Sequence, residues 1–126
     1  MYTPTKARIA AMATLLTIAS IFTLAQPAQA TMGQCPSGYF CIWEDNTYQG
    51  HFARFTIGSS DLNVAIGGFV FNDKTTAVWN RTGRIWCTYQ DKNYGGSVRS
   101  WGAGASNPNL SGIGWNDRIS SLRRCP

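Results

Sequence analysis

The chain is poor in the residues that most catalytic and metal sites use. It has one histidine, His51, and six acidic residues among 126. It contains no Cys-x-x-Cys pair and no Gly-x-Ser-x-Gly turn. Zinc sites usually combine close cysteine pairs with histidines, and acid–base catalysis usually needs histidine or paired carboxylates. His51 follows Gly50 at an expected hairpin, which favours a surface or packing role. The sequence therefore predicts a protein that is not an enzyme and requires no cofactor.

A run long enough to span a membrane is also missing. A transmembrane helix needs about 20 apolar residues, whereas the run from Ile9 to Leu24 is shorter and includes three threonines and a serine. Lys6 and Arg8 precede this run, and Ala28-Gln29-Ala30 follows it with the small-x-small pattern of a signal-peptidase site. We expect residues 1–30 to be a signal peptide that is cleaved before Thr31. The working molecule would then be extracellular, with no membrane attachment.

The remaining 96 residues, 31–126, suffice for a single domain. Loss of Lys6 and Arg8 leaves nine of the eleven basic residues against six acidic ones, a net charge of +3. These basic residues are dispersed along the chain rather than clustered, which argues against a nucleic-acid partner. We expect a monomer. An even number of cysteines in a short exported chain predicts two disulfides, formed by Cys35, Cys41, Cys87 and Cys125.

Helical periodicity is absent from this part of the sequence. Short runs rich in aromatic and β-branched residues alternate instead with segments rich in Gly, Asn, Asp and Ser. This alternation is typical of an all-β sandwich or barrel. Strands are expected at residues 39–44, 51–56, 75–79, 84–89, 97–101 and 118–124.

The sequence repeats itself once. Four residues of the first half recur 46 positions later with the same character: Trp43, Tyr48, Gly50 and Phe55 become Tyr89, Tyr94, Gly96 and Trp101. The Asn-Asp pair at 72–73 recurs 44 positions later at 116–117. This indicates one supersecondary unit used twice, with unit one at about 35–82 and unit two at about 83–126. In each unit we expect the two aromatics to pack together and the glycine to allow a positive φ.

The aromatic-x-x-x-x-aromatic-x-Gly opening of each unit resembles that of the βγ-crystallin domain. The segments 35–44 (CPSGYFCIWE) and 115–122 (WNDRISSL) are similar to the secreted bacterial peptidase inhibitors typified by the Streptomyces metalloproteinase inhibitor. The resemblance covers nearly all of residues 35–125. It implies a two-sheet Greek-key sandwich, stapled by disulfides, that acts as a secreted inhibitor. Its partner would be an extracellular peptidase, with metallopeptidases among the candidate targets.

The same resemblance implies a disulfide pairing. In the crystallin arrangement the first and last strands of a unit are neighbours in a sheet. Cys87 lies on the first expected strand of unit two and Cys125 at the end of its last one. Cys41, the repeat equivalent of Cys87, has no such partner in unit one. The resemblance therefore implies the disulfides Cys35–Cys41 and Cys87–Cys125.

Calcium-binding βγ-crystallins carry the pattern Asn/Asp-Asn/Asp-x-x-Ser/Thr-Ser. Residues 116–121 match it fully, and residues 72–77 depart only at the last position, Ala77. The resemblance implies two calcium sites, one using Asp117 with Ser120 and the other using Asp73 with Thr76. Basic neighbours at 74 and 118 predict weak binding. Turn formation is the competing interpretation. A calcium-binding structural or envelope-associated protein is accordingly an alternative function.

Two long loops are candidates for the inhibitory contact, residues 58–68 and 102–114. Each has an apolar residue that a peptidase pocket could accept, Val64 in the first and Leu110 in the second, although either could be buried as an anchor. We favour the second loop, because Pro108 restricts its backbone and lowers the ordering cost. Leu110 would be its main contact. A small antimicrobial or toxin-like module is a further alternative, suggested by size, disulfides and basic charge.

Overall fold

The computed structural model describes residues 31–126, so the expected signal peptide lies outside the described residues. Within the described part, no helix is long and apolar enough to cross a membrane. The first half of this region contains η1 (Met32–Gln34), β1 (Phe40–Asp45), η2 (Asn46–Tyr48), β2 (Gln49–Phe55), β3 (Gly58–Ser59) and β4 (Ala77–Asn80). The second half contains β5 (Trp86–Asp91), η3 (Lys92–Tyr94), β6 (Gly95–Trp101), β7 (Ser106–Asn107), η4 (Leu110–Ile113) and β8 (Ser121–Arg124).

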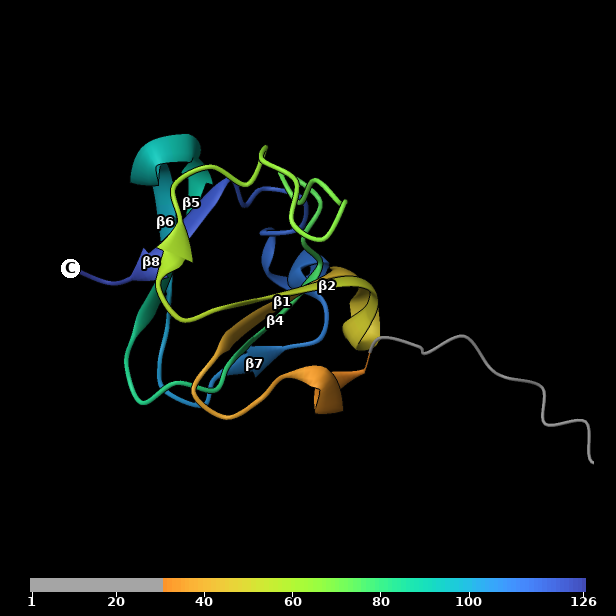
Figure 1. Ribbon diagram of the computed structural model, residues 1–126. Helices are drawn as coiled ribbons and strands as arrows, with labels where there is room; N and C mark the ends of the chain where they lie inside the picture. Colours follow the sequence, from red (N-terminus) through yellow and green to blue (C-terminus); the bar gives the residue numbers. More distant parts are fainter. Residues whose placement is uncertain (1–30) are drawn as a thin grey trace, which may run out of the picture.

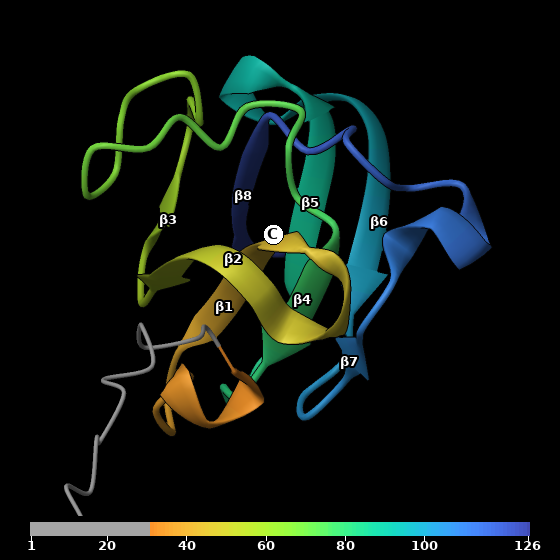
Figure 2. The same cartoon turned by 90° about the vertical axis from the view of Figure 1, so that its right-hand side faces the viewer.

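The strands form two antiparallel four-stranded sheets, in the orders β2-β1-β4-β7 and β3-β8-β5-β6. Each sheet contains three strands of one unit and one short strand of the other. Strand β3 leaves unit one to pair with β8, and β7 leaves unit two to pair with β4. Figure 1 and Figure 2 show the two sheets packed against each other with these exchanged strands at opposite edges. The predicted all-β, two-sheet Greek-key sandwich is confirmed.

The core lies between the sheets and draws on both units. Phe40 of β1 and Trp86 of β5 are fully buried and stack with ring centroids 5.0 Å apart and planes 12° from parallel. Burial of one such large side chain contributes about 1.5–3 kcal/mol. The other buried members of this cluster are Ile42, Ala53, Phe55, Leu62, Phe71, Val78, Trp101, Leu110, Trp115, Ile119 and Leu122. Because the two sheets share this one core, neither unit can bury its apolar face alone.

The repeated turns fold as the aromatic pattern predicts. Trp43 packs edge-on against Tyr48 with ring centroids 5.0 Å apart, and Tyr89 packs against Tyr94 at 5.6 Å. The glycine of unit one, Gly50, has φ +77°, and its counterpart in unit two has φ +72°. The second aromatic residue of each pair and the residue before it also adopt positive φ values, between 55° and 61°. The glycine pattern alone gave no indication of these two further left-handed residues.

Both disulfides are present, and no described cysteine is free. Cys35 pairs with Cys41, and Cys87 pairs with Cys125, as the crystallin resemblance implied. The first disulfide closes a short loop that starts before β1 and ends at the second residue of that strand. It packs next to Trp43 and Ala77. The second links β5 to the residue after β8, which are neighbouring strands of one sheet. Each unit therefore carries one staple.

A buried asparagine joins the two units. The Nδ2 group of Asn80, at the end of β4, donates to the carbonyl oxygens of Arg84, Trp101 and Gly102 at 2.7–3.0 Å. Its Oδ1 accepts from the backbone N–H of Thr82 at 3.0 Å. All of the amide's hydrogen-bonding capacity is used inside the protein. Asn80 thereby fixes the linker between β4 and β5 to the end of β6.

Candidate functional site

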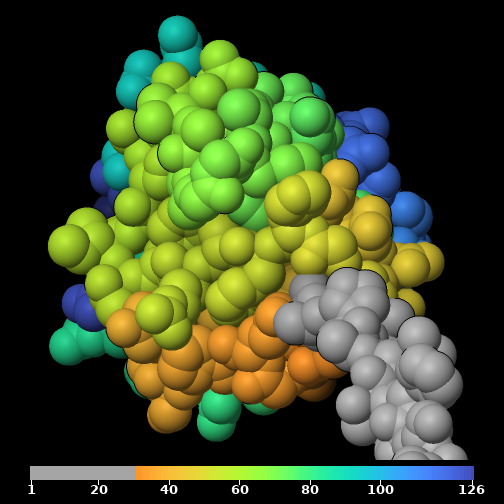
Figure 3. Space-filling view, turned by 45° about the vertical axis from the view of Figure 1, so that its right-hand side comes forward, coloured from red at the N-terminus to blue at the C-terminus, as the bar shows by residue number. Residues whose placement is uncertain are grey.

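The most prominent exposed loop runs between β3 and β4; we call residues 60–70 the Val64 loop. Figure 3 shows this green segment at the top of one face of the molecule, above β2. Its base is fixed by Leu62, which is fully buried in the core. The Leu62 N–H donates to the carbonyl of Ser120 at 2.9 Å, and its own carbonyl accepts from the N–H of Asn72 at 3.0 Å. The loop is therefore anchored on both units.

The tip of the Val64 loop is a tight reverse turn. Ile66 and Phe69 exchange backbone hydrogen bonds of 2.8 and 3.1 Å around Gly67 and Gly68, which have φ +57° and +83°. Two successive positive φ values are the signature of a type I′ hairpin turn, which disfavours residues with a Cβ. Val64 lies between this turn and the Leu62 anchor, and its side chain is 64% exposed. An apolar side chain is thus presented from backbone that is fixed on both sides.

An aromatic stack holds the end of this loop against β2. The rings of Phe69 and His51 lie parallel, with centroids 3.9 Å apart. His51 Nδ1 is 2.6 Å from Glu44 Oε2, and this hydrogen bond holds the pKa of Glu44 below its ordinary value of 4.5. Lys74 Nζ lies 5.2 Å from the Phe69 ring centre, within cation–π range. His51 therefore has a packing role at the surface. The Gly-Gly pair of the loop is the sequence signal for the turn that brings Phe69 to it.

The second loop differs from the expectation. Leu110 is fully buried, so the hypothesis that it is the main exposed contact of an inhibitory loop is wrong. The reason is one local and one distant hydrogen bond: Asn109 caps η4 by accepting the Ser111 N–H at 3.0 Å, and the Leu110 N–H donates to the carbonyl of the distant Thr76 at 2.8 Å. Both bonds direct Leu110 inward. Pro108 is exposed, and its carbonyl accepts the N–H of Thr47 at 2.8 Å, which ties this loop to the first turn.

The two Asn-Asp segments meet each other across the units. The Asp73 N–H donates to the Ile119 carbonyl, and the Asp117 N–H donates to the Thr75 carbonyl, each at 3.1 Å. Ser120 Oγ donates to Asp73 Oδ1 at 3.1 Å. The sequence had grouped Asp117 with Ser120 and Asp73 with Thr76, within each segment. The structure instead pairs Asp73 with Ser120, because the backbone hydrogen bonds between the two segments place Asp73 beside the hydroxyl of the other unit.

An open hollow surrounds the Asp73–Ser120 pair. Its lining is rich in oxygen donors and includes Asp61, Asn63, Asn72, Asp73, Gln90, Asp91, Lys92 and Ser120. Carboxylate, amide and hydroxyl oxygens are suitable ligands for Ca²⁺. Among the described residues, however, no three His, Cys, Asp or Glu side chains lie close enough together to hold a metal ion. The oxygen ligands are thus of the type that calcium prefers, but the carboxylates do not converge on one point, which fits only weak binding.

Comparison with solved structures identifies the fold class of the protein. The chain is similar to a solved structure from work on the evolution of the eye-lens βγ-crystallin domain fold, with a TM-score of 0.65 and 20% identity, covering 72% of this chain and 89% of that one. It is similar to a βγ-crystallin from Ciona intestinalis, with a TM-score of 0.60 and 25% identity, covering 70% and 100%. A βγ-crystallin domain from Flavobacterium johnsoniae gives a TM-score of 0.56 and 30% identity, covering 67% and 90%. The protein is a βγ-crystallin-type sandwich.

The family follows from the sequence model that the chain matches. Residues 28–101, more than half of the chain, match the model of peptidase inhibitor family I36. The chain belongs to this family, whose members are typically secreted, and it is a peptidase inhibitor rather than an enzyme. No curated protein matches the chain significantly in sequence.

Proposed function

We propose that this protein inhibits an extracellular endopeptidase and that the Val64 loop makes the inhibitory contact. One observation carries the choice of loop: Val64 is an exposed apolar side chain held between the buried Leu62 anchor and the Ile66–Phe69 turn. A contact loop that is already ordered loses little conformational freedom on binding, so more of the contact energy appears as affinity.

The extent of the family match supports the same loop. The matched residues, 28–101, contain the whole of the Val64 loop and end before the loop that follows β6. The burial of Leu110 removes the main apolar contact of that second loop. Metallopeptidases are the first targets to test, because the family member that the sequence resembles inhibits a metalloproteinase. Serine and cysteine endopeptidases complete the panel.

Val64→Ser is expected to weaken inhibition by ten- to one-hundred-fold, about 1.4–2.7 kcal/mol, because it removes an apolar anchor from a peptidase pocket. The measurement is the inhibition constant of residues 31–126 against secreted metallo-, serine and cysteine endopeptidases, together with melting curves. Val98→Ser is the matched control, since Val98 is 55% exposed and lies on the far strand β6.

Two results would contradict this proposal in different ways. Equal inhibition by wild type and Val64→Ser would remove the Val64 loop from the contact and leave the inhibitor function in place. Failure of the wild-type protein to inhibit any member of the panel would contradict inhibition of these peptidase classes.

A weak calcium site is a second candidate property, favoured by the Asp73–Ser120 hydrogen bond across the two units. Asp73 and Ser120 would supply the central oxygen ligands there, and the ion would reinforce the contact between the units. At the related position Asp117 would act with Thr76. The nearby Lys74 and Lys92 oppose a cation, which sets the expected affinity near 10⁻⁴–10⁻³ M, roughly the range of weak extracellular sites.

Millimolar calcium is expected to raise the melting temperature of the wild-type protein, and Asp73→Asn is expected to abolish most of that rise. Titration calorimetry with Ca²⁺ alone, and with Mg²⁺ as control, measures the binding directly. Asp45→Asn is a suitable control variant, because Asp45 lies at the end of β1, outside the hollow. No heat and no melting shift in the wild-type protein would leave the Asn-Asp segments as turn formers only.

A further inference from the structure

A second surface of the molecule combines exposed isoleucines with arginines; we call Ile57, Ile85, Arg84, Arg123 and Arg124 the Ile57 patch. Ile57 is 86% exposed, the highest value among the large hydrophobic side chains of the described residues, and Ile85 is 56% exposed. Single exposed apolar residues are common on protein surfaces. Two of them around the only adjacent arginine pair of residues 31–126 are a more specific arrangement.

The fold builds this patch through a close backbone contact. Gly58 has φ +111°, and a Cβ there would lie 2.3 Å from the Leu122 carbonyl and 2.9 Å from the Cα of Arg123. Only glycine lets β3 lie so close to β8, and this contact sets Ile57 beside the two arginines. On the other side of β8, the Cys125 N–H donates to the Ile85 carbonyl at 3.0 Å.

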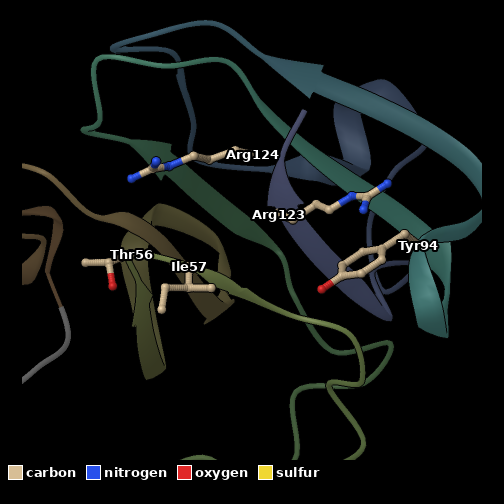
Figure 4. Close-up of a pocket in the computed structure, with 5 residues that line it drawn as sticks. All are labelled: Thr56, Ile57, Tyr94, Arg123 and Arg124. Atoms are coloured by element: carbon tan, nitrogen blue, oxygen red, sulfur yellow. The ribbon is translucent and has the colours of Figure 1, made fainter. Parts of the chain in front are cut away.

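Arg123 and Arg124 are consecutive in a strand, so their side chains point to opposite sides. Figure 4 shows the side chain of Arg123 directed toward the Tyr94 ring and that of Arg124 directed away from it, with Thr56 and Ile57 across the hollow. The Arg123 guanidinium lies 4.1 Å from the ring centre of Tyr94, which fixes its position. Arg124 also lines a second hollow with Arg84 and Ile85. The patch therefore consists of two adjoining hollows that share Arg124.

Among residues 31–126, no neighbouring acidic side chain compensates the charge of the patch. No aspartate or glutamate of this described part lines either hollow. Within residues 31–126 the one ion pair is that of His51 with Glu44, so none of these arginines is paired there. The acidic residues Asp61, Asp73 and Asp91 line a hollow at the other end of the same sheet, because β5 runs from Trp86 near the patch to Asp91. Such separation of charge favours an acidic partner surface at the Ile57 patch.

We propose that the Ile57 patch is a docking surface for an acidic protein segment that carries an apolar side chain, and that the inhibited peptidase supplies this segment. The assignment to the peptidase rests on the proposed function. A stable interface uses about 20–30 residues from each partner, more than the eleven of the Val64 loop. Strand β3 begins directly after Ile57 and leads to the base of that loop. Figure 2 shows β3 running up to the loop. A single partner that receives Val64 can thus reach the patch along β3.

The first arm of the test measures the rate constants of association with, and dissociation from, an inhibited peptidase. The salt concentrations are about 20 and about 500 mM, a range over which ionic screening changes strongly. Arg124→Glu is expected to slow association about ten-fold more than Arg118→Glu at low salt, and the difference should vanish at high salt. Both positions are exposed, and both substitutions change the net charge equally. Ile57→Ser should speed dissociation by about ten-fold. Identical salt dependence for the two charge reversals would overturn the proposal.

The second arm needs no peptidase and separates this proposal from the proposed function. A Glu-Glu-Leu-Glu-Glu peptide is titrated into ¹⁵N-labelled protein, and the NMR signals of the backbone amides are followed. The amide signals of Ile57, Ile85 and Arg124 are expected to shift in the wild-type protein, and no signal of the patch is expected to shift in the Arg124→Glu variant. The absence of shifts at these residues would overturn the proposal even where inhibition is observed. Shifts at the patch in a protein that inhibits no peptidase would support the acidic-segment site and contradict the inhibitor function. If the protein binds phosphatidylglycerol vesicles and the peptide causes no shift of its amide signals, the proposal is overturned and the patch is a membrane-binding surface instead.

Discussion

Replacing Cys87 and Cys125 together with alanine will lower the free energy of unfolding by about 4 kcal/mol, because the bond closes a long loop in the unfolded chain. The two cysteines are 38 residues apart in sequence. They join the first strand of unit two to the end of its last strand, so the loop contains most of that unit. Without the bond the unfolded state gains the conformational freedom of this whole segment. For a domain with one shared core, a loss of this size is a large part of the total stability.

The other disulfide provides the matched comparison. Cys35 and Cys41 are six residues apart, and the same loop-closure relation gives roughly 2 kcal/mol for their removal. Urea unfolding of the wild-type protein and of the two double alanine variants measures both values. Cys35 and Cys41 are the more deeply buried pair, so lost packing adds to the stability lost when they are replaced. This narrows the difference in unfolding free energy between the two double alanine variants. A short-loop variant that proves less stable than the long-loop variant would show that packing, and not loop closure, dominates.

The parts of the fold that could be predicted from the sequence are those set by local contacts. Each aromatic pair lies five residues apart in one hairpin, so the spacing and the following glycine specify the turn, and the repeat then implies two such units. The exchanged strands β3 and β7 were not predicted. They have two residues each, lie in Gly- and Asn-rich segments, and carry no alternation of apolar residues. Their positions depend on contacts between distant parts of the chain: β3 on the approach of Gly58 to the backbone of β8, and β7 on its pairing with β4.

The candidate site shows the same division between local and distant contacts. The sequence identified Val64 and Leu110 as the apolar residues of the two loops, but it could not say which one faces solvent. That outcome depends on the hydrogen bond from the Leu110 N–H to Thr76, which lies 34 residues earlier. The pairing of Asp73 with Ser120 likewise depends on how the two units meet. A pattern within one segment indicates which side chains can act, and the topology decides which of them act together.

Thr88→Val will lower the free energy of unfolding by about 3 kcal/mol, although it makes the core more apolar. Thr88 is fully buried, and its Oγ1 accepts hydrogen bonds from the indole N–H groups of Trp101 at 3.0 Å and Trp115 at 3.1 Å. The same hydroxyl donates to the carbonyl of Arg99 at 3.3 Å. Valine has nearly the same shape, so the substitution removes these bonds with little change in volume. Each buried donor that loses its acceptor costs about 1–3 kcal/mol.

Thr88→Ser is the control that separates hydrogen bonding from packing. Serine keeps the hydroxyl and loses one methyl group, which should lower stability by about 1 kcal/mol. The expected order of stability is therefore wild type, then serine, then valine, whereas side-chain hydrophobicity alone would place valine first and serine last. In a domain of this size about 1 kcal/mol shifts the melting temperature by 4–8 °C, so the valine variant should melt more than ten degrees below the wild type. Calorimetry of the three proteins gives the order directly. A valine variant as stable as the serine variant would mean that the two indole groups find other acceptors, and that Thr88 does not hold β5, β6 and the Trp115 segment together.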